Sequence, residues 1–120
     1  MKLCLTTSGK DLDAPLDERF GRAPSFIVYD LDADTFELID NKQNLNAAQG
    51  AGIQAAQTVM NSGAKAVITG HCGPKAFRVL SAAGIKLYGA RAGTIAEAIQ
   101  QYRDGSLTVM DDANVDGHWV

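Results

Sequence analysis

The stretch Val-Ile-Thr-Gly-His-Cys-Gly-Pro-Lys-Ala-Phe-Arg, residues 67–78, contains a strand end, a turn and a helix start in direct succession. Three β-branched residues predict the strand, and the glycines at 70 and 73 predict a tight turn. Pro74 suits the first helical position, because proline presets φ and that position needs no hydrogen-bonded N–H. The free N–H groups and the dipole of such a helix start attract anions. The stretch therefore predicts one wall of an anion site.

Regular patterns extend to both sides of this stretch. Aromatic and β-branched runs predict strands over residues 2–7, 25–31, 35–41, 66–69 and 85–88, and residues 107–110 have the composition of a further short strand. Apolar residues at helical spacing predict helices over 51–62, 74–83 and 94–102, with Met60 and Ala83 among the inward positions and Thr94 as a cap.

The order of these elements predicts the architecture. Three strands followed by alternating helices and strands favour a single α/β domain over residues 1–110. The simplest arrangement is a mixed five-stranded sheet in the order 3-2-1-4-5, flanked by helices, with strands 1, 4 and 5 parallel. Residues 111–120 are predicted to form a weakly ordered C-terminal tail.

Composition limits the partners and the compartment. The chain has 120 residues, a net charge of −3 and a sequence pI near 5.2, which argues against nucleic acid and acidic membranes as partners. Two cysteines make no disulfide framework, and the N-terminal residues are too polar for a signal peptide. We therefore expect a cytoplasmic protein, and a monomer in the absence of an apolar helix stripe.

The predicted topology brings several loops to one edge of the sheet. The carboxyl ends of strands 1, 4 and 5 share a rim, where open α/β sheets usually bind ligands. The segments that enter strand 2 and the first helix lie on the same rim. The candidate binding residues there are Arg19, Phe20, Gly21, Arg22, Gly70, His71, Cys72, Gly73, Pro74, Lys75 and Arg91.

These residue types suit a large anionic metal sulfide. Glycines allow the backbone to approach closely, the cations balance charge, and Phe20 can cover an apolar face of the ligand. Ion pairing of Arg19 and Arg22 with the neighbouring Asp17 and Glu18 is the alternative interpretation, as is a solvated side chain for Arg91. The Gly-Ala-Gly stretch at 50–52 is either a second donor surface or a flexible helix entry.

Cys72 and His71 are the candidate metal ligands. A cysteine in a glycine-flanked turn before a helix is expected to be exposed, with a lowered thiol pKa and a thiolate able to bind copper or a molybdenum-bound metal. His71 can donate a hydrogen bond to a sulfide or bind metal. An exposed unligated thiol and a histidine without a role are the competing interpretations. Zinc is poorly supported, because the chain has two cysteines and two histidines without zinc-site spacing.

Three stretches together resemble a known family. They are Asp-Glu-Arg-Phe-Gly-Arg-Ala-Pro-Ser-Phe at 17–26, Gly-Ala-Gly at 50–52 and Thr-Gly-His-Cys-Gly-Pro-Lys-Ala-Phe at 69–77. The chain, from residue 2 to about 110, resembles the dinitrogenase iron–molybdenum cofactor biosynthesis family, which includes NifX and the carboxyl-terminal part of NifB. The turn before Pro74 also looks like that of the orange protein branch, whose members hold a molybdenum–copper–sulfide cluster without covalent attachment.

The resemblance implies an RNase H-like fold and a non-catalytic carrier of a metal–sulfur cluster. The cargo it implies is a molybdenum–copper–sulfide cluster or, alternatively, an iron–molybdenum–sulfur precursor. Protein donors and acceptors of that cluster are the implied partners, and direct bonding through Cys72 or His71 is an expectation of the same kind.

Two other functions compete with the carrier. A two-metal nuclease on the same fold needs clustered inward carboxylates, and strand 1 supplies none. A redox or ligand sensor acting through Cys72 in a partner complex is the stronger alternative.

Overall fold

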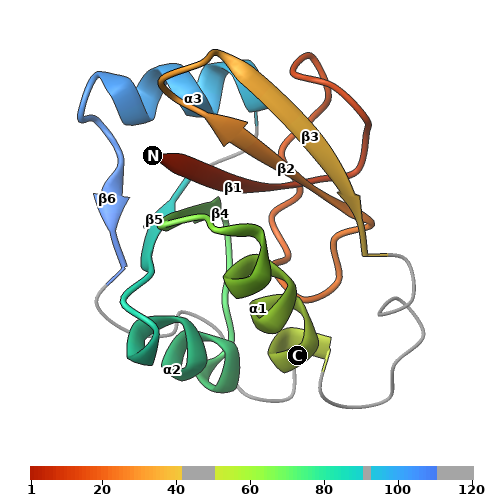
Figure 1. Cartoon of the computed structure of the whole chain (residues 1–120), viewed down its shortest axis with the longest axis vertical. Helices are drawn as coiled ribbons and strands as arrows, with labels where there is room; N and C mark the ends of the chain where they lie inside the picture. The colour runs from red at the N-terminus through yellow and green to blue at the C-terminus, as the bar shows by residue number, and fades with distance from the viewer. Residues whose placement is uncertain (42–50, 91–92, 111–120) are drawn as a thin grey trace.

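The computed structural model describes residues 1–41, 51–90 and 93–110 of the chain. Within these residues, six strands form one mixed sheet in the order β3-β2-β1-β4-β5-β6 (Figure 1). The strands are β1 Lys2–Thr7, β2 Ser25–Asp30, β3 Thr35–Asp40, β4 Ala66–Thr69, β5 Lys86–Gly89 and β6 Thr108–Val109. The helices are α1 Ala51–Ser62, α2 Pro74–Ala82 and α3 Ile95–Arg103. The predicted α/β domain and the order of its first five strands are confirmed.

The sixth strand corrects the five-stranded prediction. β6 follows a turn at Gly105, whose φ is +72°, and pairs antiparallel with β5 through Tyr88 with Val109 and Gly89 with Thr108. The composition of residues 107–110 indicated a short strand, but two residues are too few to give a periodic signal, and the pairing of this strand with the β5 edge was not predicted. The RNase H-like assignment stays a prediction, and the predicted tail lies outside the described residues.

β1 lies in the middle of the sheet, and the sheet separates two hydrophobic cores. It runs antiparallel to β2 and parallel to β4, and β4 runs parallel to β5. Helices α1 and α2 cover one face and α3 covers the other (Figure 1). Cys4 packs into the first core, while Leu3 and Leu5 pack into the second, as the alternation of β1 predicts. Cys4 is buried, as a small apolar residue would be.

Two inward positions were predicted wrongly. Met60 is 41% exposed, and the neighbouring Val59 is buried in its place. Ala83 is exposed, because it is the C-cap residue that follows the last residue of α2. The predicted cap at Thr94 is confirmed, because its side chain accepts a hydrogen bond from the Glu97 N–H at 3.1 Å and forms a capping box.

Candidate functional site

The carboxyl ends of the three parallel strands meet at one rim of the sheet. β1 ends at Thr7, β4 at Thr69 and β5 at Gly89, and the Ala90 N–H donates to the Thr69 carbonyl at 3.0 Å. A cavity of about 270 Å³ opens there, lined by Glu18, Gly70, His71, Gly89 and Ala90. The topology therefore brings together segments that are far apart in the sequence, as predicted.

The segment before β2 lies directly beside the turn after β4. The His71 N–H donates to the Glu18 carbonyl at 2.6 Å, and the Phe20 N–H donates to the His71 carbonyl at 3.1 Å. These two bonds form a short parallel bridge between Arg19 and His71. The two stretches of the family-like pattern thus share one strip of backbone at the rim.

Gly70 is required by this close approach. A Cβ placed on Gly70 would lie 2.8 Å from the Glu18 Cβ and 2.9 Å from the Glu18 Cα. Real Cβ atoms essentially never approach other atoms below 3.0 Å, and the Glu18 main chain cannot move without breaking the bridge to His71. Glycine at this position therefore sets the geometry of the cavity wall.

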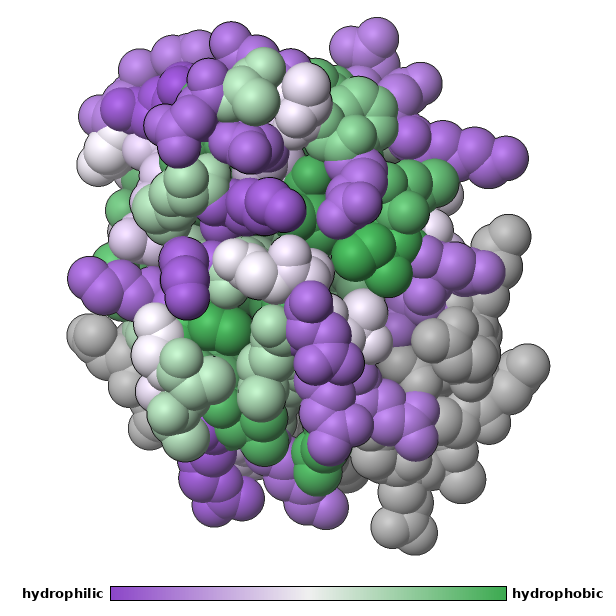
Figure 2. All heavy atoms as spheres, in the orientation of Figure 1, coloured by the Kyte–Doolittle hydropathy of each residue, from purple (hydrophilic) through white to green (hydrophobic). Residues whose placement is uncertain are grey.

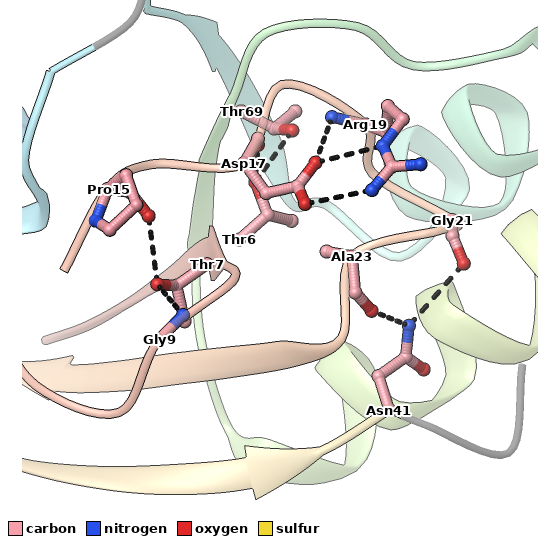
Figure 3. A network of polar contacts seen from close by, with 10 residues as sticks. All are labelled: Thr6, Thr7, Gly9, Pro15, Asp17, Arg19, Gly21, Ala23, Asn41 and Thr69. Atoms are coloured by element: carbon pink, nitrogen blue, oxygen red, sulfur yellow. Dashed lines mark hydrogen bonds and ion pairs between the residues drawn. The ribbon is translucent and has the colours of Figure 1, made fainter. Parts of the chain in front are cut away.

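Buried hydroxyl groups anchor the first half of this segment (Figure 3). The Thr6 hydroxyl donates to the Asp17 carbonyl at 2.5 Å, and the Asp17 N–H donates to the Thr6 carbonyl at 2.9 Å. The Thr6 hydroxyl is also 2.9 Å from the Thr69 hydroxyl, and both threonines have no exposed surface. These hydroxyls tie β1, β4 and the incoming segment together below the rim.

Asn41 anchors the second half of the segment before β2. Its amide Nδ2 donates to the Ala23 carbonyl at 2.8 Å and to the Gly21 carbonyl at 3.4 Å (Figure 3). Its main-chain N–H donates to the Pro24 carbonyl at 2.9 Å. The residue has no exposed surface. The side chain and the main chain of Asn41, the residue directly after β3, together hold the Gly21–Pro24 backbone in place.

The cations of the rim differ in their surroundings. Arg19 forms a two-point ion pair with Asp17, with both N···O distances at 3.2 Å, and its hydrogen bond to Asp17 raises the pKa of the guanidinium (Figure 3). The alternative of ordinary ion pairing therefore holds for Arg19. Arg22 is partly buried and interacts within the chain, while Lys75 is exposed in the first turn of α2. Arg91 and Gly50 lie outside the described residues.

Cys72 contradicts the expectation of an exposed, acidic thiol. It has no exposed surface, packs into the core beside Ala76 and Leu80, and its Sγ is 3.6 Å from the Gly73 carbonyl. Burial raises the pKa of the Cys72 thiol to about 12. The prediction failed because the side chain turns inward under the turn, where desolvation outweighs the nearby helix start.

We expect Cys72 to resist modification while the protein is folded. Iodoacetamide at neutral pH should label neither Cys72 nor Cys4, whose pKa burial also raises, whereas both should react in urea. Because the folded pKa lies above the unfolded one, the free energy of unfolding should fall as pH rises from about 9 toward 12. Mass spectrometry after labelling checks the first expectation. Rapid labelling of the folded protein at Cys72 would contradict it.

Phe20 also differs from its predicted role. Its side chain is 1% exposed and packs in the core with its ring centroid 5.9 Å from that of Phe26. The ring therefore cannot cover a ligand at the rim in this conformation. Its main chain still contributes, through the hydrogen bond to His71.

His71 and Glu18 are the exposed side chains on the cavity wall. His71 was predicted as a site residue, whereas Glu18 was considered only as a salt-bridge partner. The bridge to His71 brings Glu18 to the cavity, and this contact between distant segments leaves no local sequence signal.

The start of α2 has the predicted form. Pro74 occupies the first turn, and Gly73 is the extended residue before it, with no side-chain cap. The first N–H groups of the helix are therefore not satisfied by a capping side chain and keep their attraction for an anion.

The donor set fits a preformed anion better than a bare metal ion. Within residues 1–41, 51–90 and 93–110, no three His, Cys, Asp or Glu side chains come together as a metal site. The rim offers backbone donors, one imidazole and nearby cations. Such groups can hydrogen-bond the sulfide surface of a cluster without replacing the ligands of its metals.

A larger hollow elsewhere is less suited to a ligand. It has a volume of about 370 Å³ and lies between Tyr29, Asp34 and α3. Its charged groups already pair, because Arg103 contacts Asp34 at 3.0 Å and lies over the Tyr29 ring. No helix in the described part of the chain is long and apolar enough to cross a membrane.

A family model and several known proteins match this chain. The model of the dinitrogenase iron-molybdenum cofactor family matches residues 1–105. An uncharacterised protein of Methanocaldococcus jannaschii is 32% identical over 95 residues, which cover 77% of this chain and 80% of that protein.

Two solved structures are similar over most of their length. The apo form of the orange protein from Desulfovibrio gigas has 40% sequence identity and a TM-score of 0.92, covering 95% of this chain and 96% of that one. A Thermotoga protein assigned to the NifB type has 34% identity and a TM-score of 0.78, covering 88% and 90%.

Proposed function

The chain belongs to the dinitrogenase iron-molybdenum cofactor family, and we propose that it is a non-catalytic carrier of an anionic molybdenum-containing metal–sulfide cluster. The cluster is cargo, held non-covalently on the rim at the carboxyl ends of β1, β4 and β5. The cargo favoured by the sequence pattern is a molybdenum–copper–sulfide cluster, with an iron–molybdenum–sulfur precursor as the alternative. The carrier acts as a cytoplasmic monomer between protein donors and acceptors of the cluster.

One observation carries this proposal. The chain has 40% identity to an orange protein solved in its apo form, with a TM-score of 0.92 across almost the whole of both chains. The turn at 69–75 and the segment at 17–22, on which the sequence resemblance rests, meet in one hydrogen-bonded strip beside the cavity. The residues that carry the family resemblance therefore lie beside the cavity, in a fold shared with the orange protein.

The rim would hold a cluster through donors and charge. His71 can donate a ring N–H to a sulfide, and the uncapped start of α2 presents main-chain N–H groups. Lys75, in the first turn of α2, and Arg22, in the segment before β2, add positive charge. The carboxylate of Glu18 repels an anion. Glu18 therefore supports the site through its main-chain carbonyl, which accepts the hydrogen bond from the His71 N–H.

The burial of Cys72 favours non-covalent binding. A thiol without exposed surface and with a raised pKa is a poor ligand, because the metal-binding form is the thiolate. The same burial weakens the alternative of a sensor acting through Cys72, since oxidation also requires an accessible thiolate. Metal ligation by Cys72 would need the turn to open.

The site also favours binding over catalysis. Among the described residues that line the cavity, Glu18 is the one carboxylate, whereas two-metal phosphotransfer requires several. We therefore propose no enzymatic step for this protein.

Cluster loading tests the proposed function. The protein is mixed with tetrathiomolybdate and Cu(I), desalted, and analysed for Mo, Cu and Fe together with its visible spectrum. A parallel sample receives iron and sulfide with molybdate. We expect coloured, stoichiometric metal to remain after desalting, and the sample that retains it identifies the cluster class.

A pair of lysine variants locates the cluster. Lys75→Ala removes a cation at the rim, whereas Lys86→Ala removes one at the opposite end of the parallel strands. Retention should weaken about tenfold in the first variant, equivalent to about 1.4 kcal/mol, and stay unchanged in the second. Equal retention by both variants would move the cluster away from α2, and absence of metal in every sample would refute the carrier.

A further inference from the structure

β3 forms an edge of the sheet and crosses the molecule in front of β2 in Figure 1. All six residues of β3 pair with β2, from Thr35 with Asp30 to Asp40 with Ser25, without a bulge. Among the described residues, β2 alone pairs with β3. Every second N–H and C=O along an edge strand points away from its neighbour, so β3 offers a straight template for another strand.

The two faces of β3 differ in chemistry. Phe36 and Leu38 pair with Tyr29 and Ile27 and lie on the α3 side, yet they are 40% and 42% exposed. Glu37, which is exposed, lies on the opposite side. Figure 2 shows hydrophobic surface bordered by hydrophilic groups over the region where β2 and β3 lie.

Within the described residues, the edge has only part of the usual protection against pairing. Natural edge strands carry charged residues, above all lysine, or they carry proline or a bulge, or they are very short. β3 is six residues long, with the sequence Thr-Phe-Glu-Leu-Ile-Asp; it carries two carboxylates but no lysine, proline or bulge. Exposed apolar side chains on such an edge favour strand addition.

Charge determines which strand can be added. Residues 30–40 contain five carboxylates and no basic residue. Asp32 pairs with the N-terminal amine at 2.8 Å, and Asp34 pairs with Arg103 at 3.0 Å. Glu37 and Asp40 lie on the strand itself. Pairing of two β3 edges would bring these carboxylates from both copies to one junction, which opposes a second copy as the partner.

We propose that the β3 edge is a docking site for a partner protein, which adds a strand of alternating apolar and basic residues. The apolar side chains of that strand pack beside Phe36 and Leu38, and its lysines or arginines face Glu37. The inference rests on the edge geometry and charge alone, and cluster-free protein tests it independently of the proposed cargo.

A synthetic peptide serves as the probe. It alternates lysine with valine or isoleucine, is capped at both ends, and is titrated into isotope-labelled protein at physiological salt. We expect amide shifts concentrated in β2 and β3, with slowed hydrogen exchange at alternate residues of β3. The same peptide N-methylated along its backbone keeps its charges but loses its donors, and should bind at least about tenfold more weakly.

Two charge reversals complete the test. Glu37→Lys should weaken peptide binding about tenfold, while Asp13→Lys, an equal charge change at an exposed loop residue, should leave it nearly unchanged. Equal weakening by both variants, or equal binding of the N-methylated peptide, would reduce the effect to general charge attraction and overturn the proposal. Protein that dimerises without peptide, with β3 protected from exchange, would also overturn it, because the occupant would then be a second copy.

Discussion

The substitution Asn41→Asp should destabilise the protein by about 3 kcal/mol or more at neutral pH. The Asn41 side chain has no exposed surface, and its amide donates to the carbonyls of Ala23 and Gly21. A carboxylate of the same shape has no donor and faces these carbonyl oxygens with a negative charge. Both the lost hydrogen bonds and the buried charge then oppose folding.

The penalty should depend on pH with a definite sign. Burial and the facing carbonyl oxygens raise the folded-state pKa of the new carboxyl above its unfolded value of about 3.9. The protonated form is favoured in the folded protein, and it retains one donor. The variant should therefore approach normal stability below about pH 4 and lose it as the pH rises.

Urea unfolding at pH 4 and pH 7 measures this effect. Asn61→Asp, on an exposed position of α1, is the matched control and should change the free energy of unfolding by about 0.5 kcal/mol or less. A similar loss of stability for both variants, or a loss at Asn41 that does not change with pH, would show that this amide does not hold the Gly21–Pro24 backbone.

Gly70→Ala should produce the second large effect, a destabilisation of about 1–3 kcal/mol together with weaker cluster retention. The added Cβ would meet the Cα and Cβ of Glu18 within 3.0 Å, so the segment before β2 must move away from the turn. That movement would break the main-chain hydrogen bonds between Glu18, His71 and Phe20.

A neighbouring glycine provides the control. Gly89 also lines the cavity, but among the described atoms a Cβ there would meet only the Met110 Cε, at an ordinary 3.5 Å. Gly89→Ala should therefore leave stability nearly unchanged. Thermal unfolding of both variants, followed by loading with tetrathiomolybdate and Cu(I), separates the two cases. Equal stability of the two variants would contradict the close packing assigned to Gly70.

The sheet order and the rim could be predicted because they follow from strong, regular signals. Strand and helix periods, together with the rules for parallel connections, place the ends of β1, β4 and β5 on one edge. Composition alone indicated a short strand over residues 107–110, and it could not show that this strand pairs with the edge of β5.

The interior of the site could not be predicted from local sequence. The flanking glycines indicate that Cys72 lies in a turn, but they do not determine the direction of its side chain. That side chain packs in the core cluster that also contains Ala76 and Leu80. The hydroxyl pair of Thr6 and Thr69 and the amide of Asn41 act on segments distant in sequence. Strand periodicity marks these positions only as strand residues, and their hydrogen-bond partners become visible in three dimensions.

Amide mapping of the loaded protein shows where on its surface the cluster binds. Spectra of isotope-labelled protein are compared before and after it takes up the molybdenum–copper–sulfide cluster. We expect the largest shifts at Gly70 and His71, in the first turn of α2 and in the segment 18–22, with little change around Lys65 and Lys86. Largest shifts around Arg103 and Asp34, or at the β3 edge, with metal retained, would contradict a cluster site on this rim.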